Sequence, residues 1–191
     1  MQYLDQNEIR ALLRVAYERD RLFWLAALVT VSHGLRISEL LSLTVGDLHI
    51  GPSGPVLRLQ GLKGGLEQES TLHSSADPLF DEATALCLHA HGLKKIGERY
   101  LFTRCRQRHD QLIRQFGAEA GIDPRKLHWH ALRHSHGHFV FRETLSLGAV
   151  KQALRHRSIR TSLIYLQERD NAQALEARDR ALHSISGGLT P

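Results

Sequence analysis

Apolar residues recur at helical spacing along most of the chain. The first such face follows Asp5, a predicted N-cap, and Glu8 stands where a capping box requires an acidic residue. The apolar positions of this face are Ile9, Leu12, Leu13 and Ala16. The almost continuous apolar stretch 21–33 predicts a second, buried helix, which Gly34 ends.

A third, short helix is predicted from Arg36, with Ile37, Leu40 and Leu41 facing inward and a break at Gly46. The period then changes to that of β-strands between residues 54 and 73. Alternating residues 56–60, a glycine-rich turn over 61–65 and a returning segment predict a small antiparallel hairpin.

Helical spacing resumes after Pro78 and continues to the end of the sequence. Helices are expected over 78–95, 107–120, 130–143, 145–156 and 160–167, and a last amphipathic stretch covers 171–185. The fold class predicted from this pattern is mainly α with a small antiparallel β-hairpin or sheet.

The bulk composition narrows the class of protein. The 191 residues suit one domain, and the 42% hydrophobic content is sufficient for a buried core. The longest apolar run, "LFWLAALVTV", is about half of the ~20 residues that a membrane helix needs. No secretory signal opens the sequence, and Cys87 and Cys105 form no CxxC pair. These features predict a cytoplasmic protein that does not bind a membrane.

Charge is distributed unevenly along the chain. Residues 1–98 carry 9 Lys and Arg against 12 Asp and Glu, a net −3, whereas residues 99–191 carry 16 against 8, a net +8. A basic C-terminal half favours a polyanionic partner, nucleic acid first, and a solvated basic surface is the alternative.

Five histidines gather in "HWHALRHSHGH", residues 128–138, and three of them share a helical face at 130, 134 and 138. That spacing suggests a metal site. However, no Asp or Glu lies between 124 and 142, and Arg133 would repel a dication. We therefore predict no metal here, and note that His130 and Arg133 lie side by side on one helical face.

Three motifs occur in a fixed order: "HGLRISELLSL", "HALRHS" and "LRHRSIRTSLIYL". Each alone is common, but together, with His156 nine residues before Tyr165, they resemble the tyrosine recombinase (phage integrase) family. The resemblance covers the catalytic domain of that family, across about residues 4–170, and implies its catalytic-domain fold.

The resemblance also implies six catalytic residues, of which Tyr165 is the nucleophile. They are Arg36, Lys63 in the hairpin turn, His130, Arg133, His156 and Tyr165. Glu39 matches the usual acidic neighbour of the first arginine. Taken singly, Arg36 would be a surface arginine, Lys63 a solubilising residue and Tyr165 a core residue, so the interpretation depends on their common order.

One position departs from the family pattern. Arg155 precedes His156 where the family usually has glycine in an "LGH" turn. An L-residue is harder to place at positive φ. The turn is therefore expected to differ or to be strained, and Arg155 is a candidate DNA contact.

The implied chemistry acts on a DNA phosphodiester. Arg36 and Arg133 would bind the non-bridging oxygens, and His156 would donate one more hydrogen bond. A tyrosine with a pKa of about 10 needs a proton acceptor, for which His130 is the candidate and the phosphate the alternative. Lys63 would protonate the leaving 5′-oxygen.

The expected product is a 3′-phosphotyrosyl link, formed without ATP, metal or cofactor. Three alternatives stay open: a DNA-binding protein of this fold without activity, a nicking-closing activity like that of type IB topoisomerases, and a histidine-cluster metallohydrolase. The first lacks support beyond Arg155, because all six positions are filled.

The expected organisation is a catalytic domain over 1–170 and a C-terminal tail over 171–191 that packs on a neighbouring protomer. The length leaves no room for an N-terminal core-binding domain, as in a catalytic-domain fragment or a short fimbrial-type invertase. The expected partner is double-stranded DNA, bound by a multimer that is a tetramer of protomers. Accessory DNA-bending proteins are further candidates.

Overall fold

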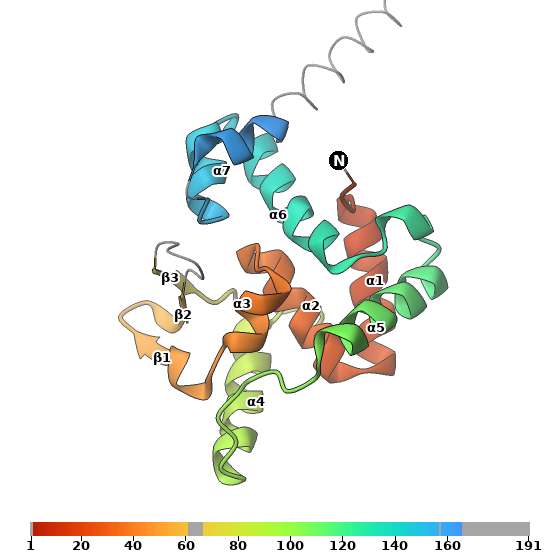
Figure 1. Ribbon diagram of the computed structural model, residues 1–191. Coiled ribbons are helices and arrows are strands. Elements are labelled where there is room, and N and C mark those ends of the chain that lie inside the picture. The colour runs from red at the N-terminus through yellow and green to blue at the C-terminus, as the bar shows by residue number, and fades with distance from the viewer. Residues whose placement is uncertain (1, 61–66, 157, 166–191) are drawn as a thin grey trace, which may run out of the picture.

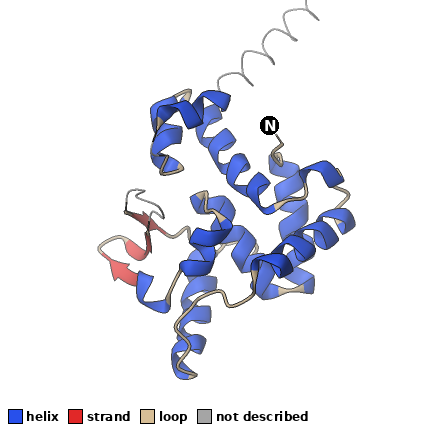
Figure 2. Ribbon diagram, in the orientation of Figure 1, coloured by secondary structure: helices blue, strands red, loops and turns tan. Residues whose placement is uncertain are grey.

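The computed structural model describes residues 2–60, 67–156 and 158–165. In chain order the helices are α1 (Gln6–Arg19), α2 (Arg21–His33), α3 (Ile37–Ser42), α4 (Glu82–Lys95), α5 (Arg106–Glu119), α6 (Trp129–Thr144) and α7 (Leu147–Ala153). The strands are β1 (Leu48–Gly51), β2 (Gly54–Leu59) and β3 (Gln68–Thr71), and three short 3₁₀ turns cover Val45–Asp47, Pro124–Lys126 and Ile159–Ser162. The predicted class, mainly α with a small antiparallel sheet, is confirmed (Figures 1 and 2).

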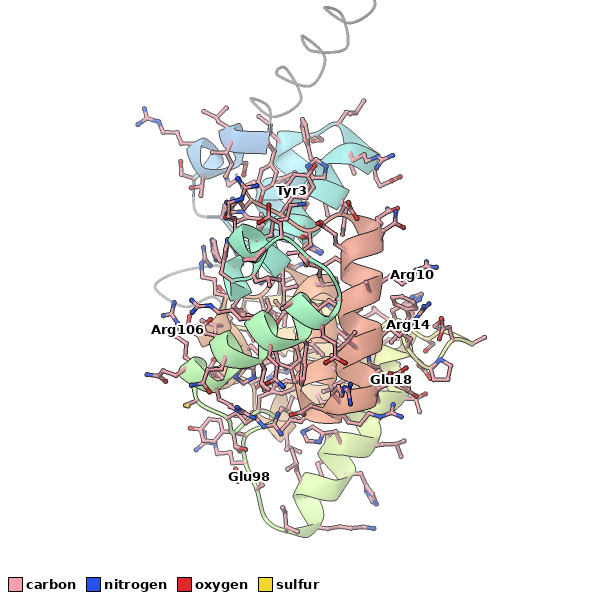
Figure 3. All side chains as sticks on the ribbon, turned by 90° about the vertical axis from the view of Figure 1, so that its right-hand side faces the viewer. Tyr3, Arg10, Arg14, Glu18, Glu98 and Arg106 are labelled. Atoms are coloured by element: carbon pink, nitrogen blue, oxygen red, sulfur yellow. The ribbon has the colours of Figure 1, made fainter. Side chains whose placement is uncertain are left out.

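The largest hydrophobic core joins α1 and α2 to α3, α4, α5, β2 and the first half of α6. The predicted capping box is present, because the Asp5 side chain accepts from the Glu8 amide while Glu8 accepts from the Asp5 amide. All four predicted apolar residues of α1 are buried. The opposite face of α1 projects Arg10, Arg14 and Glu18 to the outside (Figure 3).

The sheet is antiparallel in the order β1-β2-β3, with Leu57 of β2 opposite Leu48 on one side and Ser70 on the other. The sequence pattern predicted only β2 and β3. It missed β1 because this strand has no buried position and its Ile50 is 75% exposed, so no alternation marks it. The predicted turn with Lys63 lies outside the described residues.

Three predicted helix bounds were wrong. The helix expected over 145–156 is α7, Leu147–Ala153, which ends before the positive φ of Arg155. The other two differ because of contacts outside the helix. The third helix ends at Ser42, because the chain beyond it pairs with the segment at 99–101. For example, the Val45 amide donates a hydrogen bond to the Arg99 carbonyl. The fourth begins at Glu82 and not at Pro78, because Asp77 holds a turn before it and Asp81 caps it.

A second, smaller core lies beyond the middle of α6. We name it the C-terminal subcore, and its buried members are Phe141, Val150, Leu154 and Tyr165. It joins α6 to α7 and to the short 3₁₀ turn after α7, at the upper end of the molecule in Figure 1. The predicted tail, residues 171–191, lies outside the described part of the chain.

Within the described ranges, no helix combines the length and the apolar character needed to cross a membrane.

Candidate active site

The turn between α2 and α3 carries Arg36. Gly34 ends α2 with φ +60°, the left-handed conformation that glycine adopts most readily. A Cβ at this glycine would lie 2.7 Å from atoms of both His136 and Leu154, so the turn packs directly against α6 and the C-terminal subcore. Arg36 then forms the N-cap of α3 and keeps its side chain partly exposed.

Glu39, on the first turn of α3, is the carboxylate on which three arginines converge. It is 3% exposed and lies 2.6 Å from Arg36 Nη1, 3.2 Å from Arg155 Nη2 and 3.4 Å from Arg133 Nη1. Burial acts to raise the pKa of Glu39. The hydrogen bond from the Arg36 backbone amide and the charges of Arg133 and Arg155 outweigh burial, and they hold this pKa below its usual value.

Arg133 is buried in the middle of this arrangement. Its Nη1 donates to the Gly34 carbonyl and its Nη2 to the Leu154 carbonyl, both at 2.5 Å. Burial, with the nearby charge of Arg36, lowers the pKa of Arg133 to about 10, so the guanidinium stays charged at neutral pH. Arg133 therefore links the turn of Arg36 to the end of α7.

Arg155 also points inward, which does not agree with its expected role as a DNA contact. Its side chain is 2% exposed and donates to the carbonyls of His33 at 3.0 Å and Gly34 at 3.3 Å, besides Glu39. The expected strain is confirmed, because Arg155 has φ +53°. The side chain is thus committed to the protein interior.

His156 lies close to the segment that carries Tyr165, and Tyr165 is itself a member of the C-terminal subcore. His156 Nδ1 is 3.0 Å from the Ser162 hydroxyl, and burial lowers the pKa of His156 to about 4, so its ring is neutral at pH 7. Tyr165 is 1% exposed and its ring lies over Gly137, where an added Cβ would come 2.4 Å from the hydroxyl oxygen.

The Tyr165 hydroxyl meets His134, one helical turn after His130. Its oxygen is 3.3 Å from His134 Nδ1, and the rings of His134 and His130 pack edge to face at 4.4 Å. Burial, assisted by the neighbouring histidines, lowers the pKa of His134 to about 3. With its proton on Nε2, the neutral ring can accept a hydrogen bond from the tyrosine hydroxyl, but its low pKa opposes uptake of the proton itself.

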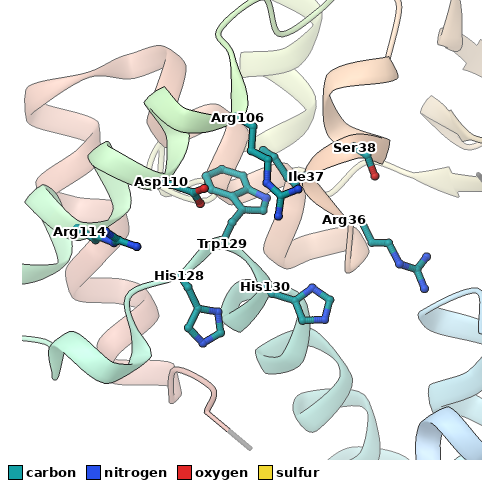
Figure 4. A pocket seen from close by; sticks show the side chains of 9 residues that line it. All are labelled: Arg36, Ile37, Ser38, Arg106, Asp110, Arg114, His128, Trp129 and His130. Atoms are coloured by element: carbon teal, nitrogen blue, oxygen red, sulfur yellow. The ribbon is translucent and has the colours of Figure 1, made fainter.

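A cavity of about 390 Å³ opens beside this cluster (Figure 4). Arg36 and His130 line it from one side, and Arg106 and Arg114 enter from α5. Its other lining residues are Ile37, Ser38, Asp110, His128 and Trp129. The guanidinium groups make this cavity suitable for an anion with several oxygens, such as a phosphodiester.

A second cavity, of about 540 Å³, lies between β3 and α7. Arg155 and His156 line it together with Glu67, Gln68, Gly148, Lys151 and Gln152. Arg155 and His156 thus face this second cavity, whereas Arg36 and His130 line the first.

Five of the six predicted site residues fall into this one connected cluster, and the sixth, Lys63, lies outside the described residues. Contacts through Glu39 join Arg36 to Arg133, and the edge-to-face contact of His130 with His134 joins His130 to Tyr165. His156 follows directly after Arg155, which shares Glu39.

Sequence reasoning missed His134, Arg106 and Arg114. The i, i+4 spacing of His130 and His134 placed them on one face, and the i, i+8 spacing does the same for the two arginines, but neither spacing identifies what the face meets. Among the described residues, no group of three or more His, Cys, Asp or Glu side chains could hold a metal ion.

Known proteins resemble this chain in sequence over most of its length. The sequence profile described as the phage integrase family matches residues 2–172. The chain is 28% identical to the tyrosine recombinase XerA of Pyrococcus furiosus over 200 residues, which cover 97% of this chain and 64% of that protein. It is 30% identical to the type 1 fimbriae regulatory protein FimE of Escherichia coli K12 over 179 residues, 85% of this chain and 84% of FimE.

Solved structures show the same fold. The XerH site-specific recombinase bound to its difH substrate superposes with a TM-score of 0.73 at 20% identity, over 91% of this chain and 52% of that one. The XerA recombinase gives 0.70 at 24% identity, over 85% of this chain and 59% of that one. The chain thus spans about half to two-thirds of the length of several relatives.

Proposed function

This chain belongs to the phage integrase family, and we propose on that basis that it is a site-specific recombinase that cleaves and rejoins DNA through a 3′-phosphotyrosyl intermediate. The observation that carries the proposal is the cluster itself. Arg36, His130, Arg133, His156 and Tyr165 come from four separate segments. Glu39 joins Arg36 to Arg133, His134 joins His130 to Tyr165, and His156 lies within electrostatic reach of both arginines.

The scissile phosphate would bind at the cavity that Arg36 and His130 line. A phosphodiester attacked by a hydroxyl gains negative charge on its non-bridging oxygens, which guanidinium groups stabilise. Arg36, Arg133 and Arg155 share the single carboxylate of Glu39, so the cluster keeps an excess of positive charge beside the cavity. His156, neutral at pH 7, would donate a further hydrogen bond from its ring.

Tyr165 would attack the phosphorus and form the covalent link. Because its hydroxyl is buried against Gly137, attack requires that it first leave this contact and turn toward the bound phosphate. His130 is the proton acceptor that the sequence suggests, with the phosphate as the alternative. His134 already faces the hydroxyl and would orient it, because its low pKa makes it a weak base. Lys63 would protonate the leaving 5′-oxygen.

The partner we propose is double-stranded DNA. Arg106 and Arg114 extend the row of cations along α5 beside the cavity, where they would bind phosphates that flank the cleaved one. A lambda integrase tetramer bound to a Holliday junction has the same fold, which supports assembly of four catalytic domains, residues 1–170, on exchanging strands. The tail, residues 171–191, would pack on a neighbouring protomer, and accessory DNA-bending proteins would assist.

The burial of Tyr165 and Arg133 favours one second candidate, a DNA-binding protein that keeps the fold without the activity. Nicking and closing without exchange is a variant of the proposed chemistry that differs only in the strand that accepts the phosphate. The experiment below separates the first of these from a recombinase.

Nicked suicide duplexes with randomised half-sites provide the test, because cleavage releases a short fragment and traps the protein on the DNA. We expect a covalent adduct with the parent chain, none with Tyr165→Phe, and an undiminished yield with the control Tyr100→Phe, which alters an exposed tyrosine. An adduct that persists in Tyr165→Phe would show that the nucleophile is another residue. Specific binding without any adduct would favour the inactive DNA-binding protein.

A further inference from the structure

We propose that Arg155 is a positioning residue that holds the segment carrying His156 and Tyr165 against the turn carrying Arg36. The inference rests on the proposed function, since it concerns how that same site is assembled. It assigns to Arg155 a role at the position where the family pattern has a glycine, which has no side chain to play it.

The C-terminal subcore has few apolar links to the main core. Its buried members are Phe141, Val150, Leu154 and Tyr165. α7 packs on α6 and on the 3₁₀ turn after it, and α6 is the helix that also packs on α2 of the main core. Leu154 touches the α2–α3 turn only where Gly34 leaves room for it. The orientation of this subcore against the turn therefore depends strongly on polar contacts, which are directional.

Two buried guanidinium groups supply those contacts and share their acceptors. Arg133 donates to the Gly34 carbonyl and to Glu39, and Arg155 donates to the same carbonyl and the same Glu39 oxygen. Arg155 adds the His33 carbonyl. If Arg133 turns toward a bound phosphate, Arg155 still satisfies the Gly34 carbonyl and the buried carboxylate, so the turn keeps its place.

The backbone supports the same interpretation. A non-glycine residue at φ +53° is strained, and such strain persists only where the surrounding contacts fix it. The three long-range acceptors of the side chain, His33, Gly34 and Glu39, all lie in the α2–α3 region. Because the side chain is 2% exposed, DNA cannot be its first partner in this arrangement.

The Arg36 amide reports on this arrangement without any DNA, because it donates to Glu39 Oε2 at 2.9 Å. We would measure its hydrogen exchange by NMR in Arg155→Gly, Arg155→Met and the control Arg142→Met, which alters an exposed arginine on α6. Glycine fits the positive φ, so Arg155→Gly removes the guanidinium and relieves the strain together. We expect exchange at Arg36 to rise at least tenfold in both Arg155 variants and to stay unchanged in the control.

The second measurement is single-turnover cleavage of a suicide duplex recovered from the randomised pool. We expect the rate constant to fall 10- to 100-fold in Arg155→Gly, with part of it restored in Arg155→Lys, while the cleaved fraction and the DNA Kd stay within twofold of the parent. A residue with a merely structural role would lower the cleaved fraction and leave the rate constant alone.

Two results would overturn the proposal. The first is an exchange rate of the Arg36 amide in Arg155→Gly that stays within twofold of the parent. The second is a tenfold rise of the DNA Kd in Arg155→Gly, with a salt dependence of binding that is weaker by about one phosphate contact. The second would make Arg155 a DNA contact after all. If the parent chain forms no adduct, the proposed function fails, and the exchange measurement alone still decides whether Arg155 positions the turn.

Discussion

Glu39 offers the sharpest test of how this site is held together, because one substitution removes the charge that three arginines share. Glu39→Gln keeps the size of the side chain and one acceptor oxygen, so Arg36 can still be bonded. Arg133 and Arg155 lose their only carboxylate within 4 Å among the described residues, while both remain buried. The perturbation is therefore electrostatic and changes little in shape.

The expected cost follows from that geometry. Removing one partner of a buried ion pair typically costs about 3–5 kcal/mol, because the charge that remains is buried and uncompensated. The carbonyls of His33, Gly34 and Leu154 still receive hydrogen bonds from the two guanidinium groups, which places the loss near the lower end, about 3 kcal/mol. With a urea m-value of about 2 kcal/mol/M, the midpoint would fall by about 1.5 M.

Urea unfolding followed by circular dichroism measures this loss, with Glu119→Gln as the matched control. Glu119 pairs with Arg19 at 2.6 Å on the surface, where solvent screens the pair, so its midpoint should not change. The lowered pKa of Glu39 also predicts how the difference depends on pH. The stabilisation from ionised Glu39 is complete above the ordinary pKa of a glutamate and is lost as pH falls through the lower pKa of the folded state. The unfolding midpoints of the parent and Glu39→Gln should therefore converge in acid. Equal midpoints at pH 7 for parent and Glu39→Gln would refute the shared-carboxylate account.

Three further outcomes are expected. Gly137→Ala puts a methyl group 2.4 Å from the Tyr165 hydroxyl and should lower the free energy of unfolding in urea by about 1–3 kcal/mol. The control Gly92→Ala, where an added Cβ meets nothing within 4 Å, should not destabilise the fold. Equal effects of the two substitutions would contradict the packing of Tyr165 over Gly137. The pKa is lowered to about 3 for His134 and to about 4 for His136 and His156, so on acidification these histidines take up protons in the unfolded chain before they do in the folded one. The free energy of unfolding should therefore hold above about pH 7 and fall between about pH 6.5 and 4. The loss by pH 5 is on the order of 2 kcal/mol per histidine, and a flat profile between pH 7 and 5 would show that these rings titrate normally. EDTA should leave the yield of covalent adduct unchanged, and a loss that added zinc restores would favour a metal-dependent reaction.

Local patterns were sufficient for the elements that contain their own signals. The capping box of Asp5 and Glu8 and the glycine at 34 mark their helix ends by short-range chemistry, and the structure has them where the sequence predicts. Elements defined by distant partners were missed or misplaced. β1 exists because β2 pairs with it, and α3 stops because residues at 99–101 pair with the chain that follows it.

The site shows the same division. The order of the motifs identified Arg36, His130, Arg133, His156 and Tyr165 as a set. The fold joins the two arginines through Glu39 and His130 to Tyr165 through His134, and it places His156 within electrostatic reach of both arginines. No local pattern could show which way Arg155 points, because the buried acceptors in the α2–α3 region are more than 100 residues away in sequence.

The same limit applies to the tyrosine. That its hydroxyl meets His134 depends on how α6 and the segment after α7 pack over Gly137, and this packing has no signature in either segment alone.

Mass spectrometry of the trapped protein–DNA adduct tests the central claim most directly. After nuclease and trypsin digestion, the account predicts a nucleotide remnant on the tryptic peptide 161–169, "TSLIYLQER", attached through a phosphate at Tyr165. A remnant on another residue, or a cleaved strand with no protein attached, would contradict it.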